Sequence, residues 1–298
     1  MLSICIPIYQ YDVCQLVKEL QSQCFAISKT FEIICIDDFS NSVIRVKNQA
    51  IKSLNHVKYI ELKENVGRSK IRNLLLKQSN YDNLIFLDCD CSIPENFIPK
   101  YFKHFDKNVV YGGRKHHINK PKDKKFSLRW KYGREREDLT IHTRKESPFL
   151  SFRSNNFMIK KTIFSLIKFD ESIKTYGHED TLLALQLKKE NISIFHIENE
   201  VIHEGLENNK QFLKKTKLGI ENLNNLYNSK KINPAEIKLL KLYVLISYLK
   251  FNFLLSLFSS LLMDLCLRKL NQKNPKIFWL DIYKLFYLHK LRSNSKIF

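Results

Sequence analysis

The chain has 298 residues, 44% of them hydrophobic, which allows one large domain or one domain with a sizeable extension. Only seven glycines and seven prolines are present, which argues against long disordered linkers. The formal net charge of +20 implies an anionic partner, but the sequence has no zinc-finger spacing, RNA-binding aromatic signature or basic region with heptads, so we expect no nucleic-acid binding.

The cysteine pattern and the N-terminus favour a reducing compartment. Seven cysteines are present, and an odd count at scattered spacings argues against a disulfide framework. Most of them lie in apolar runs, as small hydrophobic residues do. The chain opens with a strand-like run and lacks the basic stretch and cleavage site of a signal peptide. We therefore expect reduced thiols and a cytoplasmic protein.

The first ninety residues alternate between short apolar runs and segments with helical spacing. Strands are predicted over residues 2–8, 31–36, 57–62 and 84–87, and helices over residues 12–23, 43–54 and 69–78. Strands that alternate with helices imply a parallel sheet with helices on both faces.

The pattern changes after the fourth strand. A helix is predicted over 94–105 and a short strand over 109–113, followed by a highly charged stretch, 114–147, that we expect to be a loop with a solvated His116 and His117. Strands over 155–159, 192–196 and 201–203 and helices over 163–167 and 180–189 follow. From residue 208 the pattern is helical. We therefore expect a catalytic domain at 1–207 and a helical C-terminal region at 208–298.

Three acidic pairs stand where a predicted strand ends or a helix begins. Asp37-Asp38 ends the second strand, Asp88-Cys89-Asp90 ends the fourth, and Glu179-Asp180 opens a helix. In an open parallel sheet, ligands bind beyond the carboxyl ends of the strands, so we expect these acids to line one cleft. Asp88 and Asp90 are separated by one residue and point the same way on an extended chain. Such carboxylates suit Mg²⁺ or Mn²⁺, which would neutralise a diphosphate.

Several segments recur together in one known family. They are SICIPIY at 3–9, ICIDDFS at 34–40, NVG at 65–67 with Arg72-Asn73, FLDCD at 86–90, YGHED at 176–180 and Ile202-His203. In this order and at this spacing, they resemble the family-2 glycosyltransferases of the A-type fold. The resemblance covers residues 2–205. It implies an α/β GT-A fold, which is a Rossmann-like, mainly parallel sheet with helices on both faces, followed here by a C-terminal helical extension.

The resemblance also implies a nucleotide-sugar site. Pro7 and Tyr9 would line the nucleotide pocket, and Asp38 would accept a hydrogen bond from the base, commonly uracil. Arg72 would help to hold the nucleotide. Asp88 would face the ribose or a metal-bound water.

The remaining motifs imply the metal and the acid–base chemistry. Asp90 would bind Mn²⁺ or Mg²⁺ directly, and His203 is similar to the family's late histidine, which completes the coordination. Asp180 is similar to the family's catalytic base, which deprotonates the acceptor hydroxyl, and Glu179 would contact the acceptor. The implied reaction is inverting transfer of a hexose or N-acetylhexosamine from a nucleotide-diphosphate sugar, commonly a UDP-sugar, to a glycan or lipid-linked acceptor. The product would be a surface polysaccharide or a lipid-linked precursor.

The C-terminal region leaves two interpretations open. Residues 239–267 are rich in Leu, Phe, Ile and Tyr, but the uninterrupted part, 253–263, is shorter than the ~20 residues that span a bilayer. Basic and aromatic residues follow, a combination that suits binding at an anionic membrane surface. A helical subdomain packed on the catalytic domain, or a dimer contact, explains the same pattern. Under the first interpretation the protein is peripheral at the inner face of the plasma membrane.

Two other function classes compete with a transferase. A non-catalytic protein that binds nucleotide sugars or polysaccharides could keep the fold, although the retained Asp90, Asp180 and His203 argue against it. A nucleotidyltransferase also uses an α/β sheet and a metal, but it normally carries a glycine-rich phosphate loop near the first strand, and IPIYQYDV at 6–13 has none.

Overall fold

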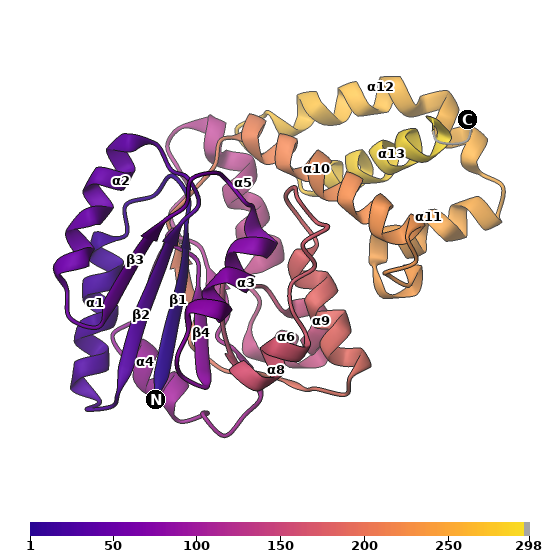
Figure 1. Cartoon of the computed structure of the whole chain (residues 1–298). Coiled ribbons are helices and arrows are strands. Elements are labelled where there is room, and N and C mark those ends of the chain that lie inside the picture. Colours follow the sequence, from indigo (N-terminus) through magenta and orange to yellow (C-terminus); the bar gives the residue numbers. More distant parts are fainter. Residues whose placement is uncertain (295–298) are drawn as a thin grey trace. The chain divides into compact units, whose positions relative to one another are not determined.

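The computed structural model describes residues 1–294, which form two compact units (Figure 1). Unit 1 comprises Met1–His117, Glu137–Lys174 and Glu179–Gly205. Unit 2 contains the chain from Leu206 onward together with two earlier segments, Ile118–Arg136 and Thr175–His178.

Unit 1 is built on a seven-stranded sheet with the order β3-β2-β1-β4-β8-β6-β9. The strands are β1 (Leu2–Ile8), β2 (Phe31–Asp37), β3 (Val57–Glu61), β4 (Asn83–Leu87), β6 (Val109–Tyr111), β8 (Asn156–Lys160) and β9 (Ile194–His196). Neighbours pair in parallel except β8, which runs antiparallel to both β4 and β6. The predicted α/β class with a mainly parallel sheet is therefore confirmed.

Helices cover both faces of this sheet (Figure 1). Successive side chains of a strand point to opposite faces, so Ile4 and Ile6 of β1 join one core while Cys5 joins the other. The first core includes α1 (Cys14–Ala26) and α4 (Phe97–Phe102). The second includes α3 (Arg68–Gln78), α8 (Lys161–Leu166) and α9 (Glu179–Lys189). Burial on both faces explains why the strands are apolar runs without polar alternation. Between β2 and β3 the chain forms α2 (Ser42–Asn48) and a 3-10 helix, Gln49–Ser53.

A second, three-stranded sheet lies in unit 1 and has the order β5-β10-β7. Its strands are β5 (Cys91–Ser92), β7 (Arg114–Lys115) and β10 (Val201–His203). β10 pairs antiparallel with β5, with His203 opposite Cys91. This pairing brings the late histidine next to the acidic end of β4.

The charged stretch 114–147 is not a loop, and that expectation was wrong. It contains β7, a 3-10 helix at Lys124–Phe126, α5 (Ser127–Tyr132), a π-helix at Gly133–Glu137 and α6 (Ile141–Glu146), which leads into α7 (Pro148–Ser151). Several of its charges are buried in ion pairs: the Arg144 guanidinium lies 2.6 Å from a Glu200 carboxylate oxygen. His116 is also buried, not solvated. The partners are distant along the chain, Glu200 for Arg144 and Asp138 for His116, so local polarity did not reveal the burial.

Unit 2 is helical, as the C-terminal pattern predicted. Its main helices are α10 (Asn209–Asn228), α11 (Lys238–Tyr248), α12 (Asn252–Leu270) and α13 (Phe278–Asn294), with a 3-10 turn at Pro234–Glu236. Their common core also includes a residue of α5; it consists of Leu128, Phe212, Leu213, Cys266, Leu270, Ile277, Leu280 and Tyr283. In the described part of the chain, no helix combines the length and apolar character needed to cross a bilayer.

Candidate active site

The carboxyl end of β2 carries two acids with different partners. Asp37 is fully buried; its carboxylate accepts hydrogen bonds from the Ser40 amide at 2.6 Å and the Tyr59 hydroxyl at 3.2 Å. Both partners belong to unit 1, one in the turn after β2 and one in β3. Asp37 therefore stabilises the turn that follows its own strand.

Asp38 fixes the segment that precedes α3. Its two carboxylate oxygens accept hydrogen bonds from the Val66 amide at 2.6 Å and the Gly67 amide at 3.0 Å. Gly67 has φ +82°, which a residue with a side chain rarely adopts. Burial raises the pKa of Asp38, and these two amide hydrogen bonds oppose that effect. Each carboxylate oxygen retains one lone pair that could accept a hydrogen bond from a base. The expected contact between Asp38 and a base stays a prediction.

At the end of β4, Asp88 is held by an arginine from α3. The Arg72 guanidinium lies 2.7 Å from Asp88 Oδ1, also donates to the Arg68 carbonyl, and lies against the Phe169 ring. The Arg72 side chain is only 2% exposed. The structure thus shows Arg72 orienting Asp88, while its predicted contact with the nucleotide stays a prediction.

Asp90 and His203 face each other across the small sheet. His203 Nδ1 lies 3.5 Å from Asp90 Oδ2. Burial acts to raise the pKa of Asp90, but the hydrogen bond and charge of His203, with Arg114 and Arg68, hold that pKa below its usual range. Because Gly205 has no side chain, the Asp90 carboxylate lies close against its backbone; a Cβ at that position would lie 2.3 Å from Asp90 Oδ2.

His116 packs against His203, and no pattern in the sequence predicted this contact. The two imidazole rings meet edge to face with centroids 5.5 Å apart. His116 Nδ1 lies 2.6 Å from Asp138 Oδ1, and its Nε2 lies 3.2 Å from Glu137 Oε2. Both acids belong to the stretch expected to be a loop, so neither contact could be foreseen from local pattern.

The first turn of α9 carries the third acidic pair. Glu179 is buried and its carboxylate lies 3.1 Å from the Arg68 guanidinium; burial acts to raise its pKa, but the charges of Arg68 and Arg72 lower it. Asp180 is partly exposed, with Arg153 Nε 3.9 Å from its Oδ2. Burial raises the pKa of Asp180; the Arg153 charge opposes this shift and the Glu179 charge adds to it. The sequence did not indicate either arginine.

The end of β1 contributes the remaining predicted residues. Pro7 is partly exposed within the strand, and Tyr9 follows the strand with 55% of its side chain exposed. Gln10 then turns the chain at φ +55°. Its backbone N–H donates a hydrogen bond to the Ser40 hydroxyl oxygen at 2.8 Å. An exposed ring at the carboxyl edge of a parallel sheet is suitably placed to stack on a flat ligand.

The residues present fit a divalent cation that is shared with a substrate. No group of three potential metal-binding side chains occurs within residues 1–294. Mg²⁺, however, is commonly held by one or two carboxylates together with substrate phosphates and waters. Asp90 and His203 supply one oxygen and one nitrogen ligand 3.5 Å apart, and the lack of a side chain at Gly205 lets the Asp90 carboxylate lie against the backbone there.

Comparison with known families assigns the chain to one of them. The family model described as glycosyl transferase family 2 matches residues 3–167, more than half of the chain. The chain belongs to glycosyl transferase family 2. The matched family segment contains Pro7, Tyr9, Asp38 and the two acids that follow β4, whereas Glu179, Asp180 and His203 lie beyond it.

Solved structures support the same fold. Residues 1–349 of S. aureus TarS in complex with UDP share 16% sequence identity with this chain, with a TM-score of 0.50, over 99% of this chain and 91% of that one. A longer S. aureus TarS structure gives 16% identity and a TM-score of 0.49 over 76% of this chain. The matched region makes up only 43% of that longer TarS chain. Among curated proteins, none matches the chain in sequence. The chain is thus a glycosyltransferase by family, with a GT-A-like fold.

Proposed function

We propose that the protein is an inverting glycosyltransferase that moves a hexose or N-acetylhexosamine from a UDP-sugar to a glycan or lipid-linked acceptor. The observation that carries the proposal is the pairing of Asp90 with His203 at 3.5 Å, just beyond the carboxyl end of β4. Uridine as the base is supported by a structure of the same fold, S. aureus TarS 1–349, which was solved in complex with UDP.

The donor side of the reaction needs stabilisation of a leaving diphosphate. Asp90 and His203 would hold Mn²⁺ or Mg²⁺, and the cation would offset negative charge on the diphosphate when it is bound. Asp88, oriented by Arg72, would accept a hydrogen bond from the ribose or from a water at the site. Tyr9 and Pro7 would pack on the base, and Asp38 would hold the turn that borders it.

The acceptor side needs a base. The acceptor hydroxyl is a poor nucleophile at neutral pH, and a carboxylate in hydrogen-bond range accepts its proton as the new bond forms. Asp180 suits this role because its carboxylate is partly exposed and burial raises its pKa, which increases its basicity. Glu179, by contrast, is buried against Arg68. We propose that Glu179 orients either the acceptor or the first turn of α9. A single in-line displacement at the anomeric carbon then inverts its configuration.

The site of action is also part of the proposal. An acceptor carried on a lipid, or a growing surface glycan, would be reached at the cytoplasmic face of a membrane, where the enzyme would bind as a peripheral protein. The sugar, the linkage and the choice between Mn²⁺ and Mg²⁺ are to be found by screening.

The test separates donor binding from transfer. UDP release from a panel of UDP-sugars is measured with and without glycan acceptors, for the wild type, Asp180→Asn and the control Glu190→Gln, an exposed acid just after the same helix. We expect Asp180→Asn to bind UDP as the wild type does and to lose transfer by at least ~100-fold, the usual contribution of a general base. Transfer at the wild-type rate in Asp180→Asn would contradict the base assignment. UDP binding without turnover of any sugar nucleotide would indicate a non-catalytic binding protein.

A further inference from the structure

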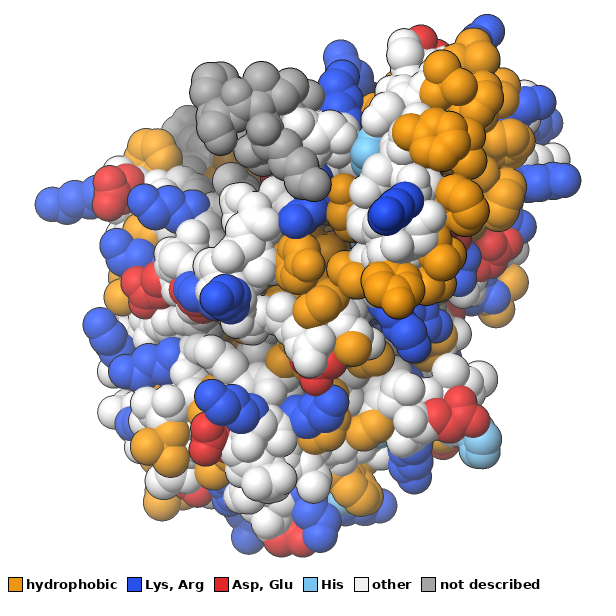
Figure 2. Space-filling model, turned by 90° about the vertical axis from the view of Figure 1, so that its right-hand side faces the viewer, with side chains coloured by type: hydrophobic (Ala, Val, Ile, Leu, Met, Phe, Trp, Pro, Cys, Tyr) orange, Lys and Arg blue, Asp and Glu red, His pale blue; other side chains and the backbone are white. Residues whose placement is uncertain are grey.

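Unit 2 exposes a large apolar surface where α11 leads into α12. We call it the α11–α12 patch; its side chains are Leu242, Leu245, Tyr248, Leu249, Phe251, Phe253, Leu254, Leu257, Phe258 and Leu261, all of them exposed. Figure 2 shows broad apolar surface at the upper right of its view, with Lys and Arg side chains at its margins. Single exposed apolar residues are ordinary, but a contiguous group of this size marks a surface that binds something.

The spacing along α12 shows that the part of the patch on this helix forms one stripe. Leu254, Leu257, Phe258 and Leu261 recur at i, i+3, i+4 and i+7, which places them in one stripe. In the same half of the helix only Leu255 is buried, whereas the core residues Cys266 and Leu270 lie near its C-terminal end. The N-terminal half of α12 therefore contributes little to the core of its own unit.

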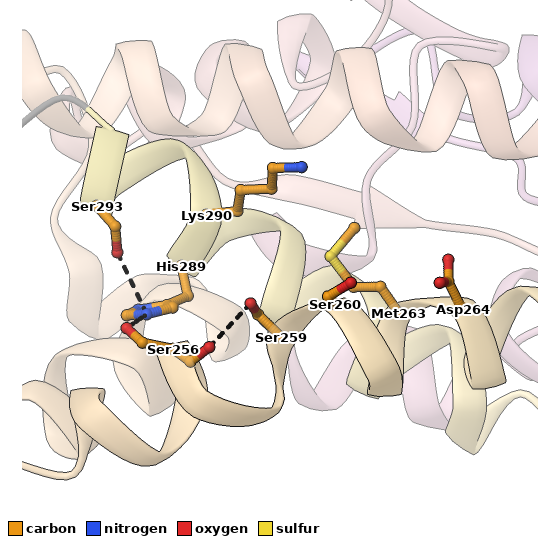
Figure 3. A pocket seen from close by; sticks show the side chains of 8 residues that line it. All are labelled: Ser256, Ser259, Ser260, Met263, Asp264, His289, Lys290 and Ser293. Carbon is orange, nitrogen blue, oxygen red and sulfur yellow. Dashed lines mark hydrogen bonds between the residues drawn. The ribbon is translucent and has the colours of Figure 1, made fainter.

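A different side of α12 faces α13 across a polar groove of about 360 Å³ (Figure 3). Ser256 and Ser259 of α12 line it together with His289 and Ser293 of α13. His289 Nε2 lies 2.8 Å from the Ser256 hydroxyl and 3.2 Å from the Ser293 hydroxyl. In its N-terminal half, α12 is thus linked to α13 through its serine side, and the leucine stripe points to a different side of the helix.

Charge is distributed very unevenly between the two units. Counted along the sequence, unit 2 holds 25 of the 50 Lys and Arg residues but only 7 of the 30 Asp and Glu residues, so it carries +18 of the net charge of +20. Unit 1 is therefore close to neutral. Exposed Lys238, Lys241 and Lys250 are interleaved with the patch in α11 and in the turn before α12, and exposed Arg268 follows the leucine stripe on the same face of α12.

An apolar face edged by cations matches one partner best. A second copy of the chain would bring another +18 unit against the first, and like charges oppose that contact. An anionic bilayer offers acyl chains to the Leu and Phe side chains and negative headgroups to the lysines around them. Each Lys or Arg near such a surface adds to the attraction.

We propose that the α11–α12 patch is a membrane-interface surface that docks unit 2 on a bilayer containing anionic lipid. The exposed side chains of the patch enter the boundary between headgroups and acyl chains, and Lys241, Lys250 and Arg268 contact lipid phosphates. This docking gives a structural basis for the peripheral location in the proposed function, but it requires no catalysis.

The experiment is vesicle flotation of the full chain without nucleotide or acceptor. Vesicles of phosphatidylcholine alone are compared with vesicles that also contain phosphatidylglycerol, at low and high salt. The test variant is Leu257→Ser/Leu261→Ser, whose side chains are 71% and 65% exposed, so the core is untouched. The matched control is Val43→Ser/Val46→Ser in α2 of unit 1, with side chains 65% and 66% exposed. Light scattering reports the oligomeric state of each protein.

We expect the wild type and the control to float with the anionic vesicles and to dissociate as salt screens the lysines. Leu257→Ser/Leu261→Ser should lower the partition coefficient at least about tenfold, since two leucines lose their apolar burial. No flotation of the wild type, or equal flotation of the test variant, would overturn the proposal. A wild-type dimer that Leu257→Ser/Leu261→Ser dissociates, without vesicle binding, would assign the patch to a second copy instead. Because no turnover is measured, failure of the transferase proposal leaves this result unaffected.

Discussion

Arg153 lies next to the carboxylate that we assign as the catalytic base, and its removal has a predictable effect on the pH dependence of transfer. Arg153 Nε is 3.9 Å from Asp180 Oδ2. At this distance two unit charges attract by about 1 kcal/mol in water and about 4 kcal/mol near a protein surface. The Arg153 side chain is 39% exposed, so solvent screening favours the lower figure. One kcal/mol corresponds to about a fivefold change in the proton affinity of Asp180.

The sign follows from the role of Asp180 as a base, which must be deprotonated. Burial raises the pKa of Asp180 above its ordinary value, the Glu179 charge raises it further, and Arg153 opposes both effects. In Arg153→Gln the opposing charge is gone, so the pKa rises further. The acidic limb of the kcat/KM profile should move to higher pH, with activity on that limb falling about fivefold. Activity on the alkaline side of the limb should change far less.

The assay is the pH profile of kcat/KM for the wild type, Arg153→Gln and Arg153→Lys, the last of which keeps the charge and serves as the control. Arg153→Lys should keep the wild-type limb. An acidic limb that is unchanged in Arg153→Gln would show that Asp180 does not control the rate and would contradict its assignment as the base. A uniform loss at every pH would instead show that Arg153 binds the acceptor.

Two further predictions concern the supports of the donor site. Arg72→Met should lower the free energy of unfolding by about 2–3 kcal/mol in denaturant titrations, because it leaves the Asp88 carboxylate, 17% exposed, without its ion-pair partner; stability equal to the wild type would contradict this. Gly205→Ala should weaken Mn²⁺-dependent UDP binding about tenfold in calorimetry, since the new methyl group displaces the Asp90 carboxylate. Gly219→Ala, where the nearest atom to a Cβ is 4.0 Å away, should bind UDP normally, and equal affinities in both variants would argue against a site at Asp90.

The sheet of unit 1 could be predicted from sequence because each strand carries its own signal. β1, β2 and β4 are nearly continuous apolar runs, and the helices between them have regular spacing, so no distant residue was needed to identify them. The same approach gave a wrong prediction for the stretch 114–147, which was expected to be a loop. Arg144 and His116 are polar in sequence yet buried, because the fold brings a carboxylate within 2.6 Å of each.

The candidate site divides in the same way. Asp88 and Asp90 were found because they end an apolar strand, and Asp180 because it opens a helix; the family resemblance supplied His203. The support of Asp88 by Arg72, of Glu179 by Arg68 and of His203 by His116 depends on three-dimensional contacts. A one-dimensional pattern carries no information on such pairs.

The donor site can be tested by calorimetry of the purified protein with UDP, in the presence and absence of Mn²⁺. We predict that UDP binds the wild type in a Mn²⁺-dependent manner and that Asp90→Ala removes this dependence, because Asp90 and His203 would hold the cation against the diphosphate. Absence of UDP binding under both conditions, or binding that neither Mn²⁺ nor Asp90→Ala changes, would contradict the assignment of this site as the donor site of a metal-assisted glycosyltransferase.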